Sequence, residues 1–298
     1  MMITIFTPTY NRGKTLPRLY ESLCSQTNKN FKWLVVDDGS SDNTRSLIES
    51  WVEEKKIDII YIYQENAGKS AAHNVGVENT DTELFTCVDS DDYLTANSVE
   101  EILESWSRIK QTDNKIGGLL LFKMLESGEP TTIYKPTTRK KGTLKSFYDD
   151  GILAGDTMLV FEKEKLKWFS FPIIDGEKFV PEAYLYDAFN YFYDFYLIPE
   201  YLYVCDYLED GYTKNMARLI ANNPKGYQTY IVQRLRYDKK VWYKLVDTIR
   251  YVAIALCCGN REIIKNAPYK CCAILMFIPG QILYLKRYRK FIMSKSVE

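Results

Sequence analysis

Three carboxylates within four positions are the side chains of this 298-residue chain that are best suited to chemistry. Asp89, Asp91 and Asp92 follow directly after residues 83–88, an apolar run typical of a β-strand. Burying such a cluster costs several kcal/mol for each unpaired ion, so we expect it at the end of a strand, where a cation can neutralise it. The Asp-x-Asp spacing offers hard oxygen ligands that suit Mg²⁺ or Mn²⁺ and leaves coordination positions for the phosphates of a substrate. An acidic turn that caps the following helix is the alternative interpretation.

Three other polar loops indicate that these carboxylates belong to a larger site. Residues 2–7, 31–36 and 57–63 are apolar runs rich in β-branched residues, and each is followed by a polar loop and a helical pattern. This alternation predicts an α/β fold of right-handed βαβ units, with a mainly parallel central sheet flanked by helices. Such sheets bind ligands beyond the carboxyl ends of their strands, where all four polar loops would then lie.

The sequence lacks both of the common glycine-rich phosphate loops. No GxGxxG follows the first predicted strand, and no GxxxxGK followed by Ser or Thr occurs. A protein that binds a diphosphate without such a loop needs another source of positive charge. A metal held by the Asp-x-Asp pair supplies one.

Four segments resemble, in the same order, the successive signatures of family 2 glycosyltransferases with the GT-A fold. They are residues 7–11 (Thr-Pro-Thr-Tyr-Asn), 35–42 (Val-Val-Asp-Asp-Gly-Ser-Ser-Asp), 66–76 (Asn-Ala-Gly-Lys-Ser-Ala-Ala-His-Asn-Val-Gly) and 88–92 (Val-Asp-Ser-Asp-Asp). The resemblance is specific from residue 2 to about residue 110, weaker to about residue 215 and absent beyond. It implies a GT-A nucleotide-diphospho-sugar transferase fold, a nucleotide-sugar donor, and Mn²⁺ or Mg²⁺ as cofactor.

The resemblance also implies roles for individual residues. In enzymes of this kind the first loop lies beside the nucleotide, and Asp38 in the second loop accepts a hydrogen bond from the ring N–H of the base. This acceptor fits uracil, with guanine and thymine left open, while Asp37 is either a second site carboxylate or a turn carboxylate. The implied nucleotide-binding residues are Thr7, Pro8, Tyr10, Arg12, Asp38, Asn66, Gly68, Lys69, Asn74, Asp89 and Ser90.

The third and fourth loops carry the implied contacts to the diphosphate and the metal. The family usually has Ala-Arg-Asn where residues 72–74 of this chain read Ala-His-Asn. His73 is a weaker cation than arginine at neutral pH, so Lys69 is the alternative contact to the diphosphate. The implied metal ligands in the fourth loop are Asp91 and Asp89, of which Asp89 also contacts the ribose or the sugar.

Related enzymes often carry a histidine that completes the metal site, and residues 207–213 stand at that position here without one. Asp210 or Glu209 is the oxygen ligand that would replace it, since hard cations accept carboxylates. A plain turn is the alternative for this segment.

Sugar transfer with inversion, which the resemblance implies, needs a general base that takes the proton of the acceptor hydroxyl. In the family an acidic pair opens a helix in the corresponding segment, and here Pro181-Glu182 stands in its place. We expect Glu182 in the first helical turn, where the helix dipole favours a carboxylate, either as the base or only as a helix-start residue. Glu177 and Asp187 are the alternative bases.

The last quarter of the chain differs from the rest in charge. Residues 224–298 contain 15 Lys and Arg against 4 Asp and Glu, which leaves 24 and 35 for residues 1–223. The two parts therefore carry net charges of about +11 and −11, a difference that indicates a partner.

An uncharged run, residues 271–285, is broken by Pro279-Gly280 and followed by a basic cluster at residues 286–290. It is too short to span a hydrocarbon layer of about 30 Å, and its basic flank suits an interfacial anchor on anionic lipid. We therefore predict a GT-A catalytic domain over residues 1–220 and a helical, basic, membrane-associating extension over residues 221–298. The alternative is that the extension packs on the catalytic domain or in a homodimer.

Seven cysteines without a CxxC spacing, and an N-terminus without a basic and apolar leader, predict a cytoplasmic protein. The basic extension predicts that this protein is peripherally associated with the inner face of the membrane. Together with the resemblance, this location implies an inverting transferase that takes a sugar from a nucleotide diphosphate, with UDP as the first expectation. The acceptor would be a hydroxyl of a capsule or other surface polysaccharide, or of a lipid-linked glycan. A nucleotidyltransferase that makes a sugar nucleotide, and a non-catalytic nucleotide-sugar-binding protein, are the alternatives. No nucleic-acid partner is expected.

Overall fold

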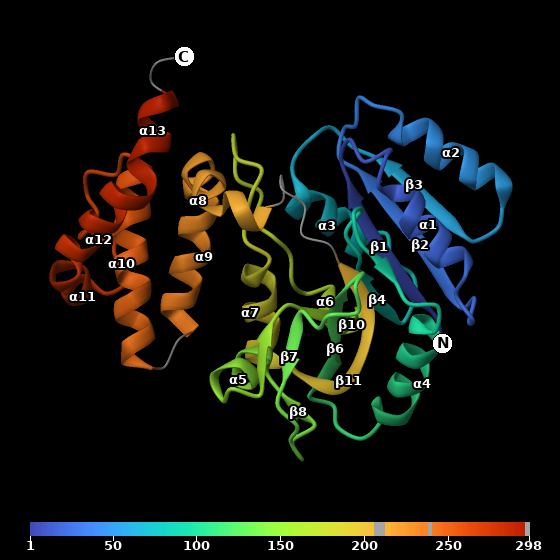
Figure 1. The fold of residues 1–298 in the computed structure, drawn as a ribbon. Coiled ribbons are helices and arrows are strands. Elements are labelled where there is room, and N and C mark those ends of the chain that lie inside the picture. Colours follow the sequence, from blue (N-terminus) through green and yellow to red (C-terminus); the bar gives the residue numbers. More distant parts are fainter. Residues whose placement is uncertain (206–211, 238–239, 296–298) are drawn as a thin grey trace. The chain divides into compact units, whose positions relative to one another are not determined.

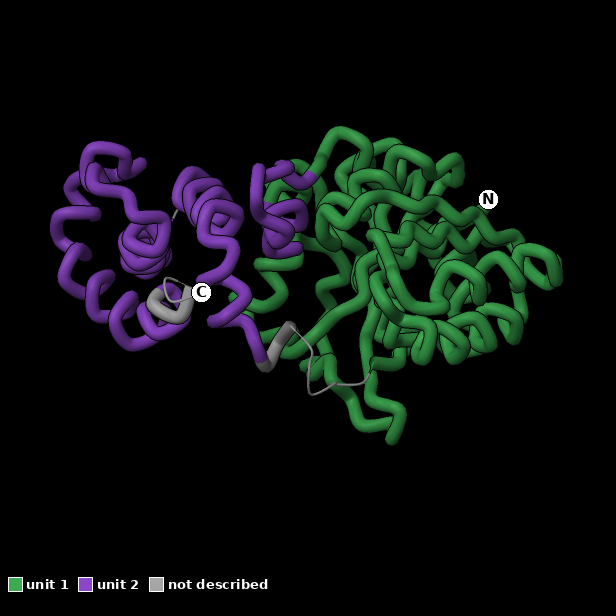
Figure 2. Tube along the Cα trace, turned by 90° about the horizontal axis from the view of Figure 1, so that it is seen from above, with its two compact units in different colours: residues 1–170, 188–207 green, residues 171–187, 208–298 purple. Residues whose placement is uncertain are grey.

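The structure, a computed structural model, describes residues 1–205, 212–237 and 240–295, and the chain divides into two compact units (Figure 1). The sheet unit comprises residues 1–170 and 188–207, and the helical unit comprises residues 171–187 and 208–298 (Figure 2). This division differs from the boundary predicted between residues 220 and 221, because residues 171–187 join the helical unit from the middle of the chain. Phe179 and Tyr184 of that segment pack against the cores of the helical unit.

A mixed sheet, in the order β3-β2-β1-β4-β10-β6-β11-β5 with β8 paired to β11, runs through the sheet unit. Its strands within the described residues are β1 (Ile3–Thr9), β2 (Phe31–Asp37), β3 (Ile59–Tyr63), β4 (Leu84–Cys87), β5 (Tyr93–Leu94), β6 (Ile116–Leu125), β8 (Lys141–Gly142), β10 (Thr157–Glu162) and β11 (Asp194–Cys205). β1 pairs in parallel with β2 and β4, and β2 pairs in parallel with β3, as the alternating pattern predicts.

The second half of the sheet departs from this parallel arrangement. β10 runs antiparallel to both β4 and β6, and β11 pairs in parallel with β6 but antiparallel with β5 and β8. A parallel pair needs a long crossover connection, usually a helix. Between β6 and β10 the chain instead forms the two-stranded sheet of β7 (Thr132–Tyr134) and β9 (Leu153–Gly155) and the short helix α5 (Leu144–Asp149).

Helices cover the parallel strands, and every residue of β1 is buried, as expected for a strand covered on both faces. The other helices that begin in the sheet unit are α1 (Leu16–Cys24), α2 (Thr44–Glu54), α3 (Lys69–Glu78), α4 (Ser98–Ile109) and α6 (Lys163–Leu166). Tyr20 of α1 stacks on Trp51 of α2 with ring centroids 4.3 Å apart. A Cβ at Gly76 would lie 2.5 Å from the ring of Phe6, so glycine at this position lets α3 approach β1 closely.

The helical unit contains the start of α7 (Ala183–Phe192), α8 (Tyr212–Asn222), α9 (Pro224–Tyr237), α10 (Val241–Cys257), α11 (Lys270–Leu275), α12 (Phe277–Leu283), the π-helix η1 (Tyr284–Tyr288) and α13 (Arg289–Lys295). α9 and α10 share a core that includes Ile231, Tyr251 and Val252. Across the described ranges of the chain, each helix falls short of the length or the apolar character that crossing a bilayer requires.

Candidate active site

The polar loops after β1, β2 and β4 lie at one edge of the sheet. Parallel pairing places Thr9 of β1 beside Asp37 of β2. It likewise places Phe6 of β1 beside Cys87, the last residue of β4. The backbone N–H of Asp38 donates to the carbonyl of Thr9 at 2.8 Å, which continues the pairing past the end of β2. The chain thus brings these three loops to the carboxyl edge, where α/β sheets bind ligands.

Asp37 is a turn carboxylate. It is fully buried, and its two oxygens accept hydrogen bonds from the backbone N–H of Ser40 and from the hydroxyl of Tyr61, each at 2.8 Å. Burial, and then the hydrogen bond to Asp37, raise the pKa of Tyr61 well above its ordinary value, so the hydroxyl keeps its proton. Gly39 completes the turn with a φ of +84°, and a Cβ there would lie 2.9 Å from the backbone nitrogen of Asn66.

Asp38 connects the second polar loop to the third. Its carboxylate accepts hydrogen bonds from the side-chain amide of Gln64 at 2.7 Å and from the backbone N–H groups of Ala67 and Gly68 at 2.8 Å each. The residue is only 5% exposed. Three in-chain donors occupy most of the lone pairs of a carboxylate, so the predicted contact with the ring N–H of a base would share an oxygen that is already engaged. The sequence did not indicate this connecting role.

Asn11 holds the first loop to the second. It has a φ of 54°, a left-handed conformation that asparagine tolerates better than most residues. Its backbone N–H donates to the hydroxyl of Ser40 at 2.8 Å, and its side-chain oxygen accepts from the N–H of Ser41 at 2.8 Å. The backbone N–H of Arg12 donates to the hydroxyl of Thr44 at 3.0 Å, which fixes the start of the Arg12 side chain beside α2.

Thr7 and Pro8, two predicted nucleotide-binding residues, lie inside the sheet unit. Thr7 is fully buried, and its hydroxyl accepts a hydrogen bond from the indole N–H of Trp33 at 3.0 Å; Pro8 is also buried. Tyr10 is 49% exposed and is the residue of this loop whose ring reaches solvent. Thr9 was not predicted as a site residue, but its hydroxyl is buried at the end of β1 without a hydrogen-bond partner among the described residues. A polar ligand at this edge would supply one.

Two of the predicted metal ligands lie beside basic side chains from other loops. The ammonium of Lys69, the first residue of α3, is 2.6 Å from an oxygen of Asp89. The guanidinium of Arg12 is 3.9 Å from an oxygen of Asp91. The structure therefore gathers Asp89, Asp91, Lys69 and Arg12 from three separate loops into one charged cluster.

Tyr203 of β11 organises the loop that carries these carboxylates. Its hydroxyl donates to Asp92 at 2.7 Å and accepts from the backbone N–H of Asp89 at 3.0 Å. The ammonium of Lys123 lies 3.8 Å from the centre of the Tyr203 ring. Because Tyr203 comes from a strand more than a hundred residues later, no local pattern could have identified it.

The charges of the cluster are unevenly compensated. Burial, and then the charge of Asp89, raise the pKa of Asp91, and the same two causes raise the pKa of Asp92 to about 7. Burial also acts to raise the pKa of Asp89, but Lys69 and Lys123 outweigh it and the pKa is lowered. Asp89 is thus ionised, while Asp91 bears the cost of a neighbouring negative charge. A divalent cation would relieve that cost.

The donor set fits a metal that is shared with a substrate. Among the described residues, no group of three or more His, Cys, Asp or Glu side chains is placed to hold a metal ion. Asp89 and Asp91 offer two carboxylates, and Mg²⁺ is usually held by one or two carboxylates together with substrate phosphates. Asp210, the third predicted ligand, lies outside the described residues.

His73 is a neutral core residue. It is 5% exposed and lies edge-on to Phe6 and Phe85, with ring centroids 5.6 and 5.3 Å away. Burial, and then the nearby charge of Lys69, lower its pKa to about 3. His73 therefore supplies no positive charge at neutral pH, and Lys69 is the cation at the start of α3.

The remaining predicted nucleotide-binding residues border the same loops. Asn66 is half-buried beside Gly39, Asn74 is half-buried on α3, and Ser90 is buried between two of the aspartates. Their contacts with a nucleotide stay predictions.

The three predicted bases have different surroundings. Glu182 is exposed and directly precedes α7, where its carbonyl accepts from the N–H of Leu185 at 3.1 Å. Glu177 accepts from the backbone N–H groups of Lys225 at 3.0 Å and Gly226 at 2.8 Å, at the start of α9. That contact satisfies helix-terminal donors, so it gives Glu177 a structural role.

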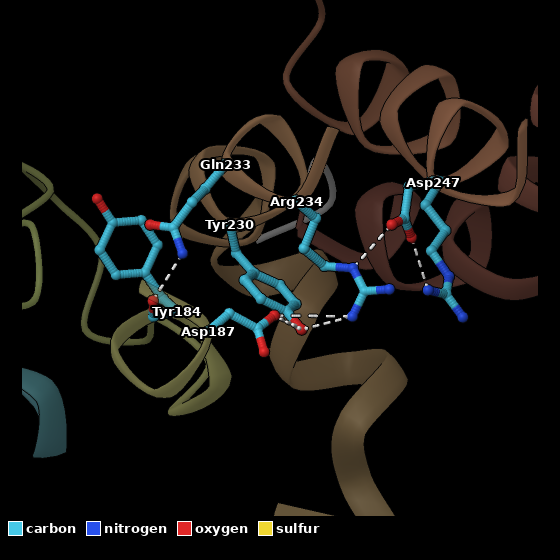
Figure 3. A network of polar contacts seen from close by, with 7 residues as sticks. Tyr184, Asp187, Tyr230, Gln233, Arg234 and Asp247 are labelled. Carbon is cyan, nitrogen blue, oxygen red and sulfur yellow. Dashed lines mark hydrogen bonds and ion pairs between the residues drawn. The ribbon is translucent and has the colours of Figure 1, made fainter. Parts of the chain in front are cut away.

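Asp187 takes part in a polar network inside the helical unit (Figure 3). It lies 3.8 Å from the guanidinium of Arg234 and 3.5 Å from the hydroxyl of Tyr230. Arg234 also pairs at 2.7 Å with Asp247, which is buried and pairs at 2.8 Å with Arg250. The network joins α7, α9 and α10, and it gives Asp187 a structural role as well.

A sequence model described as Glycosyl transferase family 2 matches residues 4–154, about half of the chain. Glycosyltransferase GlyA of Streptococcus pneumoniae serotype 4 is 40% identical over 100 residues, which cover 34% of this chain and 14% of that protein. Glycosyltransferase GlyG of the same organism is 33% identical over 118 residues, which cover 39% of this chain and 38% of that protein. The chain therefore spans well under two thirds of the length of these relatives.

Solved structures share the fold over nearly the whole chain. S. aureus TarS, residues 1–349 in complex with UDP-GlcNAc, matches with a TM-score of 0.62 at 17% identity and covers 98% of this chain and 83% of that chain. The mannosyltransferase PcManGT from Pyrobaculum calidifontis, in complex with GDP-Man and Mn²⁺, matches with a TM-score of 0.57 at 15% identity, and the match covers 99% of this chain and 86% of that chain. The α/β fold of the GT-A type predicted from the sequence is confirmed.

Proposed function

The chain belongs to glycosyl transferase family 2, and from this we propose that it transfers a sugar, with inversion, from a nucleotide diphosphate donor to a hydroxyl of a surface polysaccharide, such as a capsule, or of a lipid-linked glycan. UDP is the first nucleotide to consider and GDP the second, since TarS was solved with UDP-GlcNAc and PcManGT with GDP-Man.

The observation that carries the proposal is the charged cluster of Asp89, Asp91, Lys69 and Arg12 at the carboxyl edge of the parallel strands. A nucleoside diphosphate with a divalent cation would complement both the negative and the positive side chains of this cluster. The cation meets the two carboxylates, and the phosphate oxygens offer charge-assisted hydrogen bonds to the two basic side chains.

Asp89 and Asp91 would hold Mn²⁺ or Mg²⁺, which stabilises negative charge on a departing diphosphate when it is bound. With the two carboxylates engaged in this way, Lys69 and Arg12 would be available to donate to the phosphates. Tyr203 would keep the carboxylate loop in place through its hydrogen bond with the backbone N–H of Asp89. These residues therefore bind and orient the donor.

We propose Glu182 as the general base that takes the proton of the acceptor hydroxyl. Glu182 is exposed ahead of α7 and stands where the resemblance places the base, and the backbone N–H groups at the start of α9 already engage Glu177. The basic charge of residues 224–298 supports an acceptor at the inner face of the cytoplasmic membrane, with the protein peripherally associated there.

Incubation with UDP- and GDP-linked sugars and Mn²⁺, followed by measurement of the released nucleoside diphosphate, tests the proposal. We expect slow release of one nucleotide in water alone and faster release when the acceptor is present. Asp91→Asn should abolish release, whereas Asp81→Asn, which changes an exposed carboxylate paired with Lys32, should leave it unchanged.

Two other results would contradict sugar transfer and indicate a different function. Release of pyrophosphate from a nucleoside triphosphate and a sugar phosphate would identify a nucleotidyltransferase. Saturable binding of a donor without any release, with or without a broad set of glycan acceptors, would identify a nucleotide-sugar-binding protein.

A further inference from the structure

The outward side of α11, α12 and η1 is apolar. Its large side chains are strongly exposed: Ile274 60%, Leu275 68%, Ile278 67%, Ile282 47% and Leu285 52%. We refer to these five residues as the aliphatic face. A surface helix normally turns polar residues toward water, so a run of large aliphatic side chains there indicates an interaction surface.

The inward side of the same helices is already used for packing. Ala273 and Gly280 are buried, and Tyr288 at the end of η1 is 2% exposed. A Cβ at Gly280 would lie 2.5 Å from the Cβ of Val252 on α10, so the backbones approach closely there. Because this contact fixes the rotation of the helices about their axes, the aliphatic face cannot turn inward without losing it.

In the sequence, basic residues flank the aliphatic face and acidic residues do not. The exposed basic side chains are Lys270, Lys286, Arg287, Arg289 and Lys290. The sequence contains no Asp or Glu between Glu262 and Glu298. The surface thus combines apolar side chains with positive charge that no neighbouring carboxylate in the sequence offsets.

This combination favours an anionic lipid surface over a second copy of the chain. In a symmetric dimer each aliphatic face would meet its own copy, which would bring two basic clusters toward each other. An anionic bilayer offers both an apolar layer for the aliphatic side chains and negative headgroups for the lysines and arginines.

We propose that the aliphatic face and its basic border dock the helical unit on an anionic lipid bilayer, with α11, α12 and η1 lying in the plane of the interface. The side chains enter the boundary between headgroups and acyl chains, and the basic residues remain among the headgroups. This inference does not depend on sugar transfer, because every residue that carries it lies outside the candidate active site.

Sedimentation of the full-length protein with vesicles tests the proposal. Vesicles of phosphatidylcholine with one quarter phosphatidylglycerol should bind the protein, and vesicles of phosphatidylcholine alone should bind it at least tenfold more weakly. Binding to the anionic vesicles should weaken as salt is raised from about 0.05 to 0.5 M, because salt screens the basic residues.

The variant Leu275→Asn/Ile278→Asn should lower the vesicle partition at least tenfold, since withdrawing one such side chain from an apolar phase corresponds to about a factor of ten. The matched control is Ile133→Asn/Ile173→Asn, which removes two isoleucines of similar exposure, 65% and 69%, at other surfaces. This control should bind like the wild type, and unchanged circular dichroism should show that both variants are folded.

Three results would overturn the proposal. The first is that the wild-type protein does not sediment with anionic vesicles. The second is that it binds neutral vesicles as tightly as anionic ones. The third is that Leu275→Asn/Ile278→Asn binds anionic vesicles like the control. Analytical ultracentrifugation without lipid adds a readout. If the wild type and the control are dimers and Leu275→Asn/Ile278→Asn is a monomer, the aliphatic face binds a second copy of the chain. Release of nucleotide in solution is measured separately, so failure of lipid docking is distinguishable from failure of the proposed activity.

Discussion

Replacing Asp38 with asparagine separates two roles for one carboxylate. The resemblance to family 2 enzymes predicts that Asp38 reads the base of the nucleotide, whereas the structure shows it accepting from Gln64, Ala67 and Gly68. If the connecting role dominates, Asp38→Asn should destabilise the fold. If base reading dominates, the same variant should lose nucleotide affinity with its stability intact.

The magnitude follows from the number of donors. The asparagine keeps one acceptor oxygen and presents an NH₂ group in place of the other, so at least one buried backbone N–H, that of Ala67 or Gly68, loses its acceptor. Losing a hydrogen bond to a charged group and leaving a buried donor unsatisfied should together lower the free energy of unfolding by about 2–4 kcal/mol. Asp81→Asn is the control, because its ion pair with Lys32 is largely exposed and should be worth less than about 1 kcal/mol.

Urea unfolding followed by tryptophan fluorescence measures this change in the sheet unit. Four of the five tryptophans, Trp33, Trp51, Trp106 and Trp168, lie in that unit. A urea midpoint for Asp38→Asn equal to that of the wild type would refute the reasoning. If UDP then bound more weakly, Asp38 would be assigned to the base.

Three further changes test other parts of the structure. Asp247→Ala leaves Arg234, whose side chain is 20% exposed, without its buried partner. The free energy of unfolding, measured by thermal unfolding, should therefore fall by about 3–5 kcal/mol, and a decrease below about 1 kcal/mol would contradict a stabilising role for the network. Because the pKa of His73 is lowered to about 3, the unfolded chain takes up the proton first as the pH falls. His73 should therefore contribute a loss of stability from about pH 6.5 downward, of up to about 1.4 kcal/mol per pH unit, and the stability difference between the wild type and His73→Met should change by that amount; parallel pH profiles of the two proteins would argue against a neutral His73. Glu182→Gln should lower turnover about 10²- to 10⁴-fold with donor affinity unchanged, and the same loss in Glu177→Gln but not in Glu182→Gln would move the base.

The sequence was sufficient for the parts of the fold that depend on local patterns. Apolar runs followed by polar loops located the first four strands of the sheet to within a few residues, and their alternation with helices predicted a mainly parallel sheet, as the pairing of β1 with β2 and β4 is. The same patterns predicted that Asp89 and Asp91 follow a strand. These features depend on neighbours in the chain, which a pattern can show.

Features that depend on distant contacts could not be predicted. Tyr203 reaches the loop of Asp89 from β11, and Asp38 takes its donors from the third loop, and no spacing within either segment indicates such a partner. The antiparallel insertion of β10 and the transfer of residues 171–187 to the helical unit are likewise outcomes of packing. His73 was predicted to be a weak cation, and the structure gives the physical reason, which is burial between two phenylalanines.

Titration calorimetry of UDP, and in parallel of GDP, with and without Mn²⁺ tests the central claim most directly. If Asp89 and Asp91 hold a metal that the diphosphate shares, removing Mn²⁺ with a chelator should weaken binding of the preferred nucleotide at least tenfold, which is about 1.4 kcal/mol. Asp91→Ala should bind that nucleotide weakly and show no response to Mn²⁺, while its urea midpoint stays at or above that of the wild type because a carboxylate crowded by Asp89 has been removed. Equal nucleotide affinity with and without the chelator in the wild type would contradict the account.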